Sequence, residues 1–231
     1  ACIAEATADY FCLFHDDDLM GPDFVAEMRR AGLRYPDAVA LGANAWVVNL
    51  ESGARTRSFR AFGQYQVIAS ARDLFRRYFG RHQTGIAPFP GYVYRTAVAG
   101  KQRIPEAGGK YADVTWLLRL ASLGRVVWCN APLMDYHLHG GNDGLQESRR
   151  DRLRFLGFIK RCPACANAAD LGDYRYFLYK KLVSSSDGNP ARAARMRRFL
   201  RGQRARRRLR LGDLGAMLRK TLLKHFTRTP A

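Results

Sequence analysis

The sequence predicts an α/β domain followed by a basic helical region, and three observations support this. Apolar runs of strand length alternate with segments of helical periodicity through residues 1–148. Residues 149–231 carry helix-forming residues without strand alternation. The charge is divided in the same way, because residues 149–231 hold 23 Lys and Arg against five Asp and no Glu. The first 148 residues are nearly balanced, so we expect two regions with different electrostatics.

The composition suits a globular protein with a sizeable core. The chain has 231 residues, of which 47% are hydrophobic and 12% aromatic. No apolar run approaches the roughly 18–20 residues that a membrane-spanning helix needs. The opening residues, ACIAEATADYF, lack an initial Met and are typical of the middle of a domain, so we expect a fragment.

The five cysteines predict a reduced protein rather than a disulfide framework, because their number is odd and three lie in apolar surroundings. Cys162 and Cys165 form the one spaced pair, in the stretch CPAC. A zinc ribbon needs a second pair, and a redox motif normally starts a helix after a strand. We therefore interpret this pair as structural.

The first predicted strand is the apolar run YFCLF at residues 10–14. A helix is expected next, with Pro22 near its first position, where the missing N–H costs nothing. Its predicted apolar stripe consists of Phe24, Val25, Met28 and Leu33.

The middle of the domain predicts a strand pair and a second helix. Residues 38–50 form a strand, and the turn at residues 51–56 leads to a partner strand. Ser70 is a suitable N-cap for the helix ARDLFRRYF, which has Asp73 in its first turn.

Further strands flank a third helix. Residues 88–95, PFPGYVYR, predict a loop that enters a short strand. Residues 112–124 predict a helix that ends at Gly124. Residues 125–130 and 132–143 predict two strands, the second of which runs into a glycine turn.

The rest of the chain is expected to be helical, and its end is both basic and amphipathic. Near the C-terminus apolar residues recur at helical spacing, namely Leu211, Leu214, Leu218, Leu222 and Phe226. Arg and Lys lie elsewhere on the same helix. Such a helix can lie in the interface of an anionic membrane.

Three carboxylates in a row, Asp16, Asp17 and Asp18, follow the first predicted strand. Adjacent negative charges repel one another, so we expect something positive beside them. The candidates are a metal ion, a basic partner or the positive end of the following helix.

Two other segments carry residues of related chemistry. Asp113 lies at the start of a predicted helix, where its charge also suits the helix dipole. His137 and His139 are two residues apart on a strand and therefore face the same way. Carboxylates with one imidazole suit a divalent cation such as Mn²⁺ or Mg²⁺, and an isolated carboxylate can act as a general base.

Three stretches can be compared with a known family. The first, at residues 8–24, joins a strand, an acidic Asp-x-Asp motif and a helix in the stretch ADYFCLFHDDDLMGPDF. The second, at residues 108–124, places an acidic residue before a helix in the stretch GGKYADVTWLLRLASLG. The third, at residues 132–148, contains Tyr-x-x-His on a closing strand in the stretch PLMDYHLHGGNDGLQES. Together, in this order, they resemble the second half of a family 2 glycosyltransferase with the GT-A fold. The resemblance implies that residues 1–148 are the C-terminal portion of a Rossmann-like GT-A domain and that residues 149–231 are a basic α-helical tail.

The resemblance also implies roles for individual residues. Asp18 would bind the cation directly, and Asp16 would hold the ribose or the metal shell. Asp17 would belong to the same nucleotide-binding motif. His139 would be a further metal ligand, and Asp113 would deprotonate the acceptor hydroxyl.

The implied reaction is metal-dependent and inverting, and it transfers a sugar from a nucleotide sugar to a glycan or lipid-linked acceptor. The cation would neutralise charge on the leaving nucleoside diphosphate, while a base on the opposite face of the sugar allows in-line displacement. Gly91 and Tyr92 would line the acceptor side, where the glycine permits close approach and the tyrosine offers a face for sugar stacking.

The chain departs from the family pattern in two places. Ala112 stands where the family usually has a second acidic residue beside the base. The opening strands and helices that hold the nucleobase in the family have no counterpart in this sequence.

Each candidate residue also has a structural interpretation. The carboxylates at residues 16–18 could be a solvated helix-capping cluster, and Asp113 could be an N-cap alone. His139 could be a hydrogen-bonded histidine at a strand end. His15 and His137 are interpreted as structural.

Two other functions remain open. A metal-dependent phosphoesterase or nuclease would use the same Asp cluster, but a two-metal site needs more His and Asp ligands than the sequence offers. A non-enzymatic module would bind a membrane or nucleic acid through the basic region. Since no nucleic-acid-binding motif accompanies the charge, we expect an anionic membrane as the partner of the tail, and a cytoplasmic or peripheral location.

Overall fold

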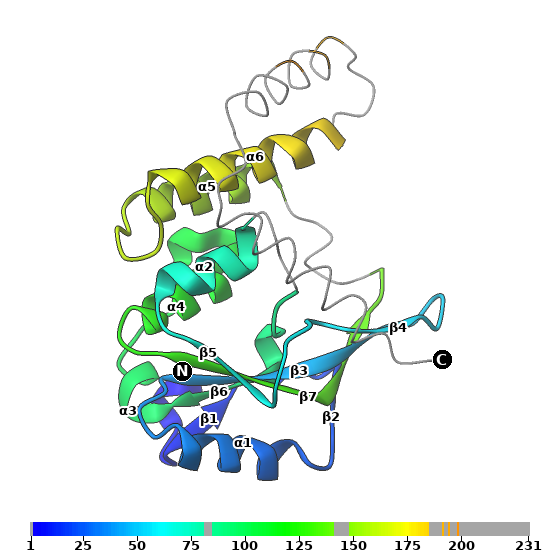
Figure 1. Ribbon diagram of the computed structural model, residues 1–231, viewed down its shortest axis with the longest axis vertical. Helices are drawn as coiled ribbons and strands as arrows, with labels where there is room; N and C mark the ends of the chain where they lie inside the picture. Colours follow the sequence, from blue (N-terminus) through cyan, green and yellow to red (C-terminus); the bar gives the residue numbers. More distant parts are fainter. Residues whose placement is uncertain are drawn as a thin grey trace.

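The computed structural model describes residues 2–80, 85–140 and 148–184, together with residues 191, 194 and 198. Within them the protein is a mixed α/β structure, one sheet with helices on both faces (Figure 1). The predicted α/β class is therefore confirmed. The amphipathic segment at residues 211–226, on which the membrane prediction for the tail rests, lies outside the described residues.

The sheet has seven strands: β1 (Tyr10–Cys12), β2 (Leu19–Met20), β3 (Ala40–Asn49), β4 (Arg55–Arg57), β5 (Tyr65–Ile68), β6 (Tyr92–Arg95) and β7 (Val126–Leu138). Their order is β1-β6-β3-β7-β2, while β4 pairs with β3 and β5 pairs with β7. β3 and β7 are parallel, and β6 is antiparallel to both β1 and β3. β1, β3 and β7 therefore point the same way, with their carboxyl ends at one edge of the sheet.

The helices form layers on the two faces of the sheet. They are α1 (Phe24–Arg34), α2 (Ala71–Phe79), α3 (Thr96–Ala99), α4 (Ala112–Ala121), α5 (Arg149–Lys160) and α6 (Ala168–Ser184), with short 3₁₀ turns η1 (Cys2–Glu5), η2 (Phe89–Gly91) and η3 (Glu106–Tyr111). α1 covers one face, whereas α2 and α4 cover the other, with α5 and α6 stacked above them (Figure 1).

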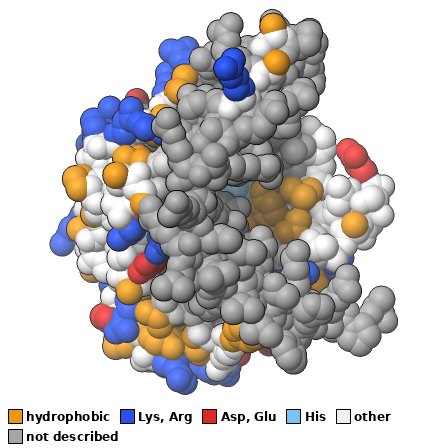
Figure 2. Space-filling view, turned by 45° about the horizontal axis from the view of Figure 1, so that its top comes forward, with side chains coloured by type: hydrophobic (Ala, Val, Ile, Leu, Met, Phe, Trp, Pro, Cys, Tyr) orange, Lys and Arg blue, Asp and Glu red, His pale blue; other side chains and the backbone are white. Residues whose placement is uncertain are grey.

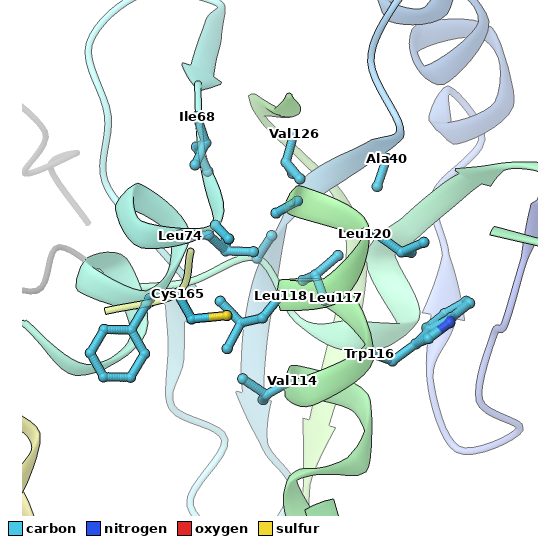
Figure 3. Packing of buried hydrophobic residues seen from close by; sticks show 14 of the residues in the cluster. Ala40, Ile68, Leu74, Val114, Trp116, Leu117, Leu118, Leu120, Val126 and Cys165 are labelled. Atoms are coloured by element: carbon cyan, nitrogen blue, oxygen red, sulfur yellow. The ribbon is translucent and has the colours of Figure 1, made fainter. Parts of the chain in front are cut away.

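The larger hydrophobic core lies between the sheet and α4. Trp116, Leu118 and Leu120 of α4 are fully buried, and Figure 3 shows α4 side chains among residues of the strands and of α2. Phe155 of α5 and Tyr174 of α6 belong to the same cluster. Both terminal helices of the described region therefore extend this core.

The smaller core lies under α1, and the prediction for this helix was partly wrong. Its first residue is Phe24, two residues after Pro22. Phe24 and Met28 are buried as predicted, but Val25 and Leu33 are 68% and 75% exposed. The buried stripe is completed instead by Ala31 and Gly32, because the helix lies close to β1: a Cβ at Gly32 would come within 3.1 Å of the Tyr10 hydroxyl.

β7 is one long strand where the sequence predicted two. Pro132 lies inside it, opposite Asn44 of β3, where the register between the two strands shifts. Proline has no N–H to donate and is tolerated in a sheet at such an irregularity. The Asn44 amide donates to the carbonyl oxygens of Phe59 and Asn130 at 3.0 and 3.1 Å, which satisfies backbone groups near the shift.

Most of the other local predictions are confirmed. β3 and β4 form the expected pair. The Ser70 hydroxyl accepts a hydrogen bond from the Asp73 N–H at 3.1 Å and caps α2. The loop that begins at Pro88 enters β6. α4 ends at Ala121, three residues before the predicted stop at Gly124.

The expectation of reduced cysteines was wrong for the CPAC pair. Cys162 and Cys165 form a disulfide in the segment between α5 and α6. Cys12 and Cys129 are free. Among the described residues, no helix is long and apolar enough to cross a membrane.

Candidate active site

Residues far apart in the sequence meet near the carboxyl ends of β1 and β7. After β1 the chain turns through residues 13–18 and enters β2, which pairs antiparallel with the last part of β7, Leu19 opposite Asp135. This pairing brings residues 15–18 beside residues 136–139. In open α/β sheets, ligands bind outside the carboxyl ends of the strands.

His15, Asp17 and Asp18 form the one group of potential metal ligands found among the described residues. Their ligand atoms lie within 4.8 Å of one another. His15 Nδ1 is 3.7 Å from Asp18 Oδ2. Two carboxylates and one imidazole are ligands that Mn²⁺ and Mg²⁺ accept.

Asp18 is the most constrained member of this group. Its side chain is fully buried, and Oδ1 accepts the backbone N–H of His137 at 2.9 Å. Oδ2 is buried and has no hydrogen-bond partner among the described residues. Burial raises the pKa of Asp18, and the nearby charge of Asp17 acts in the same direction. A buried carboxylate oxygen without a partner is costly, and a cation would satisfy it, so the residues present fit a metal site.

The two strand histidines face the same way, as their spacing predicted, and both contact Asp17. His139 Nε2 is 3.1 Å from Asp17 Oδ2, and His137 Nδ1 is 2.6 Å from the Asp17 carbonyl oxygen. The hydrogen bond with His139 lowers the pKa of Asp17. His139 therefore lies next to the metal group and orients one of its carboxylates.

The resemblance assigned Asp16 and Asp18 to the metal motif, but the structure groups other residues of this turn with Asp18. Asp16 is exposed and does not belong to the group, whereas Asp17 does. His15, which the sequence analysis interpreted as structural, is the third member. The signal for His15 was its place directly before the carboxylates, in the same turn.

Asp113 lies on the α4 side of the same region. It is the second residue of α4, whose N-cap position is Tyr111, so Asp113 is not the N-cap. Its Oδ1 accepts the N–H of Val114 at 2.7 Å. Burial raises the pKa of Asp113, and the charge of His15 partly opposes this shift. His15 is the member of the metal group whose charge acts on Asp113.

Tyr136 is a residue of this region that the sequence analysis did not assign to the site. Burial raises the pKa of its phenol, and the charges of Asp18, Asp17 and Asp113 raise it further. One side chain of β7 thus interacts with both the metal group and Asp113. Its neighbourhood depends on how β2 and α4 pack against β7, which a pattern along one strand does not reveal.

The expected acceptor-side role of Tyr92 is wrong. Tyr92 is fully buried, and its hydroxyl accepts a hydrogen bond from Trp128 Nε1 at 2.7 Å, so the ring has no face free for a sugar. Gly91 is buried too, and a Cβ there would lie 3.0 Å from Met134 Sδ. The absence of a side chain at Gly91 therefore allows close packing against Met134.

No protein-family model matches the chain, and no curated protein matches it. An assignment of function therefore rests on the motifs and on the site geometry described above.

Proposed function

We propose that this chain is a metal-dependent inverting glycosyltransferase with the GT-A fold, which transfers a sugar from a nucleotide sugar to a hydroxyl of a glycan or lipid-linked acceptor. The observation that carries this proposal is the buried Asp18 carboxylate, whose unpartnered oxygen faces a histidine and lies in the same region as Asp113.

The metal group supports the donor half of this reaction. His15, Asp17 and Asp18 would hold the cation, and His139 would keep the Asp17 carboxylate in place. When bound, Mn²⁺ or Mg²⁺ supplies positive charge for the leaving nucleoside diphosphate. Asp16, exposed in the same turn, remains available to a ribose hydroxyl.

Asp113 supports the acceptor half. A general base works best when its pKa lies nearer the working pH than that of a free carboxylate, and burial shifts the pKa of Asp113 in this direction. The group takes the proton from the acceptor hydroxyl as oxygen attacks the sugar. Ala112 leaves this base without the acidic neighbour that is usual in the resembled family.

The test is to incubate the protein with Mn²⁺ and a panel of nucleotide sugars and to measure the release of nucleoside diphosphate. We expect release with at least one donor, and its loss in Asp18→Asn and when EDTA is added. Hydrolysis of phosphodiesters or phosphomonoesters, without release from any nucleotide sugar, would instead support the phosphoesterase.

A further inference from the structure

The exposed side of α5 carries a row of basic residues. This surface, the α5 basic face, consists of Arg150, Leu153, Arg154, Lys160 and Arg161, all of which are exposed. They recur at spacings that place them on one side of a helix. The other side of α5 packs into the core through Phe155 and Ile159.

The positive charges of this face exceed the negative charge beside them, since Asp151 interacts electrostatically with Arg154 alone among the described cations of α5. Asp151 is the only acidic residue of α5, and it is engaged in a capping box with Ser148. None of the four cations forms an ion pair with an acidic residue in the part of the chain that the structure describes. Figure 2 shows Lys and Arg side chains at several places along the left margin of the molecule.

An apolar side chain lies within this charged face. Leu153 is 47% exposed and is flanked by Arg150 and Arg154. From Arg150 to Arg161 the helix advances about 16 Å, so the cations form a line that a flat anionic surface can meet. Single-stranded nucleic acid is bound by exposed aromatic rings as well as by charge, and the one large hydrophobic side chain exposed on α5 is aliphatic.

We propose that the α5 basic face binds the headgroups of an anionic lipid surface, with Leu153 entering the interfacial layer. Four cations attract anionic headgroups. An apolar side chain among them can also be buried at the lipid interface, whereas a flexible polyanion has no apolar layer to receive it. This inference rests on α5 alone and does not depend on the proposed enzymatic activity.

The first test is vesicle flotation with phosphatidylcholine, alone or mixed with phosphatidylglycerol. The triple variant Arg150→Gln, Arg154→Gln, Lys160→Gln should bind the mixed vesicles about 100-fold more weakly, since each cation near an anionic surface contributes about a factor of five. The matched control replaces Arg29, Arg30 and Arg34, exposed on α1 at the opposite face of the sheet, with Gln. A loss as large in the control would overturn the proposal.

The second test separates α5 from any other membrane contact of the full chain. An environment-sensitive dye is attached at Leu153→Cys or, as the control, at Leu33→Cys, both in a Cys2→Ser background. Burial raises the pKa of both other free thiols, that of Cys12 to about 11 and that of the buried Cys129 as well, so these thiols react slowly at neutral pH. A blue shift at position 153 alone, with the mixed vesicles, is expected. No shift there, or a shift with duplex DNA or single-stranded RNA but not with vesicles, would refute lipid binding by α5.

Discussion

At the scale of single residues, the site depends on carboxyl groups in unlike surroundings. Asp18 and Asp113 are removed from water, which raises their pKa values. Asp17 is exposed, and a hydrogen bond with His139 lowers its pKa. The exposed carboxylate is therefore ionised at neutral pH without help, whereas the buried Asp18 gains from a cation beside it.

Replacing Asp113 by Asn should remove the base and leave the fold intact. Asn keeps the shape and an acceptor for the Val114 N–H. We expect turnover of the nucleotide sugar to fall roughly 10²–10⁴-fold, the usual contribution of a general base, while Mn²⁺ affinity stays unchanged. Asp23→Asn, at an exposed carboxylate directly before α1, is the control for the loss of one acidic group. Equal turnover in wild type and Asp113→Asn would show that Asp113 is not the general base.

The same substitution should change the pH dependence of stability. Because burial raises the folded-state pKa of Asp113 above its ordinary value of 3.8, the ionised form opposes folding at pH 7. This cost disappears as pH falls through the folded-state pKa toward the unfolded value. Asp113→Asn should therefore raise the free energy of unfolding more at pH 7 than near pH 4, measured by urea titration in EDTA.

Asp151 provides a control of opposite sign. Its hydrogen bond with Ser148 lowers its pKa, so its ionised form favours folding above the unfolded value, and this contribution is lost as pH falls through the folded-state pKa. Asp151→Asn should destabilise the protein more at pH 7 than at low pH. If both variants changed the free energy of unfolding in the same direction at pH 7, the opposite pKa shifts of Asp113 and Asp151 would be contradicted.

At the scale of elements, the junction between β3 and β7 positions the end of β7. Asn44 is fully buried there. Its amide donates to Phe59 and Asn130, and its oxygen accepts the N–H of Ala45 at 3.0 Å and the hydroxyl of Ser58 at 2.8 Å. One side chain therefore holds the segment after β4 against both central strands, just before β7 reaches the site.

Replacing Asn44 by Ala should leave several buried donors and acceptors unpaired. Each such group costs about 1–3 kcal/mol, so we expect the free energy of unfolding to fall by about 3 kcal/mol or more in urea titrations. The control is Asn49→Ala, whose oxygen accepts N–H groups of Glu51 and Ser52 in an exposed turn. There water replaces the lost bonds, and the loss should be about 1 kcal/mol. Equal losses of unfolding free energy in the two variants would show that the buried hydrogen bonds of Asn44 stabilise the fold no more than the exposed ones of Asn49.

The sequence identified most elements because their signals are local. The Ser70 cap and the apolar run of β1 depend on neighbouring residues only. The face of α1 was misjudged because hydrophobicity favours large residues, whereas close approach to β1 buried the small Gly32 and left Leu33 in water. The two predicted strands around Pro132 form one because the partner strand β3 absorbs the irregularity.

At the scale of the whole molecule, the site is assembled by the order of the strands. Residues 15–18 and residues 136–139 are brought together because β2 pairs with the end of β7. Asp113 of α4 is near enough for the charge of His15 to act on it. Residue types and spacing pointed to Asp18 and to the shared side of the two strand histidines, but His139, predicted as a metal ligand, contacts Asp17 and lies outside the metal group. The sequence did not reveal that the metal group contains His15 and leaves out Asp16, or that Tyr92 is buried. Each of these features depends on contacts between distant segments.

The proposed reaction needs a cation bound at Asp18, and a calorimetric titration of Mn²⁺ measures this binding. Wild type, Asp18→Asn and Asp16→Asn are compared with and without a nucleoside diphosphate, which can complete the metal shell. We predict that Asp16→Asn keeps wild-type affinity in the titration without nucleotide and that Asp18→Asn binds more than about 10-fold more weakly, the least expected for a lost metal ligand. Equal affinity of wild type and Asp18→Asn would contradict a metal site built on this buried carboxylate.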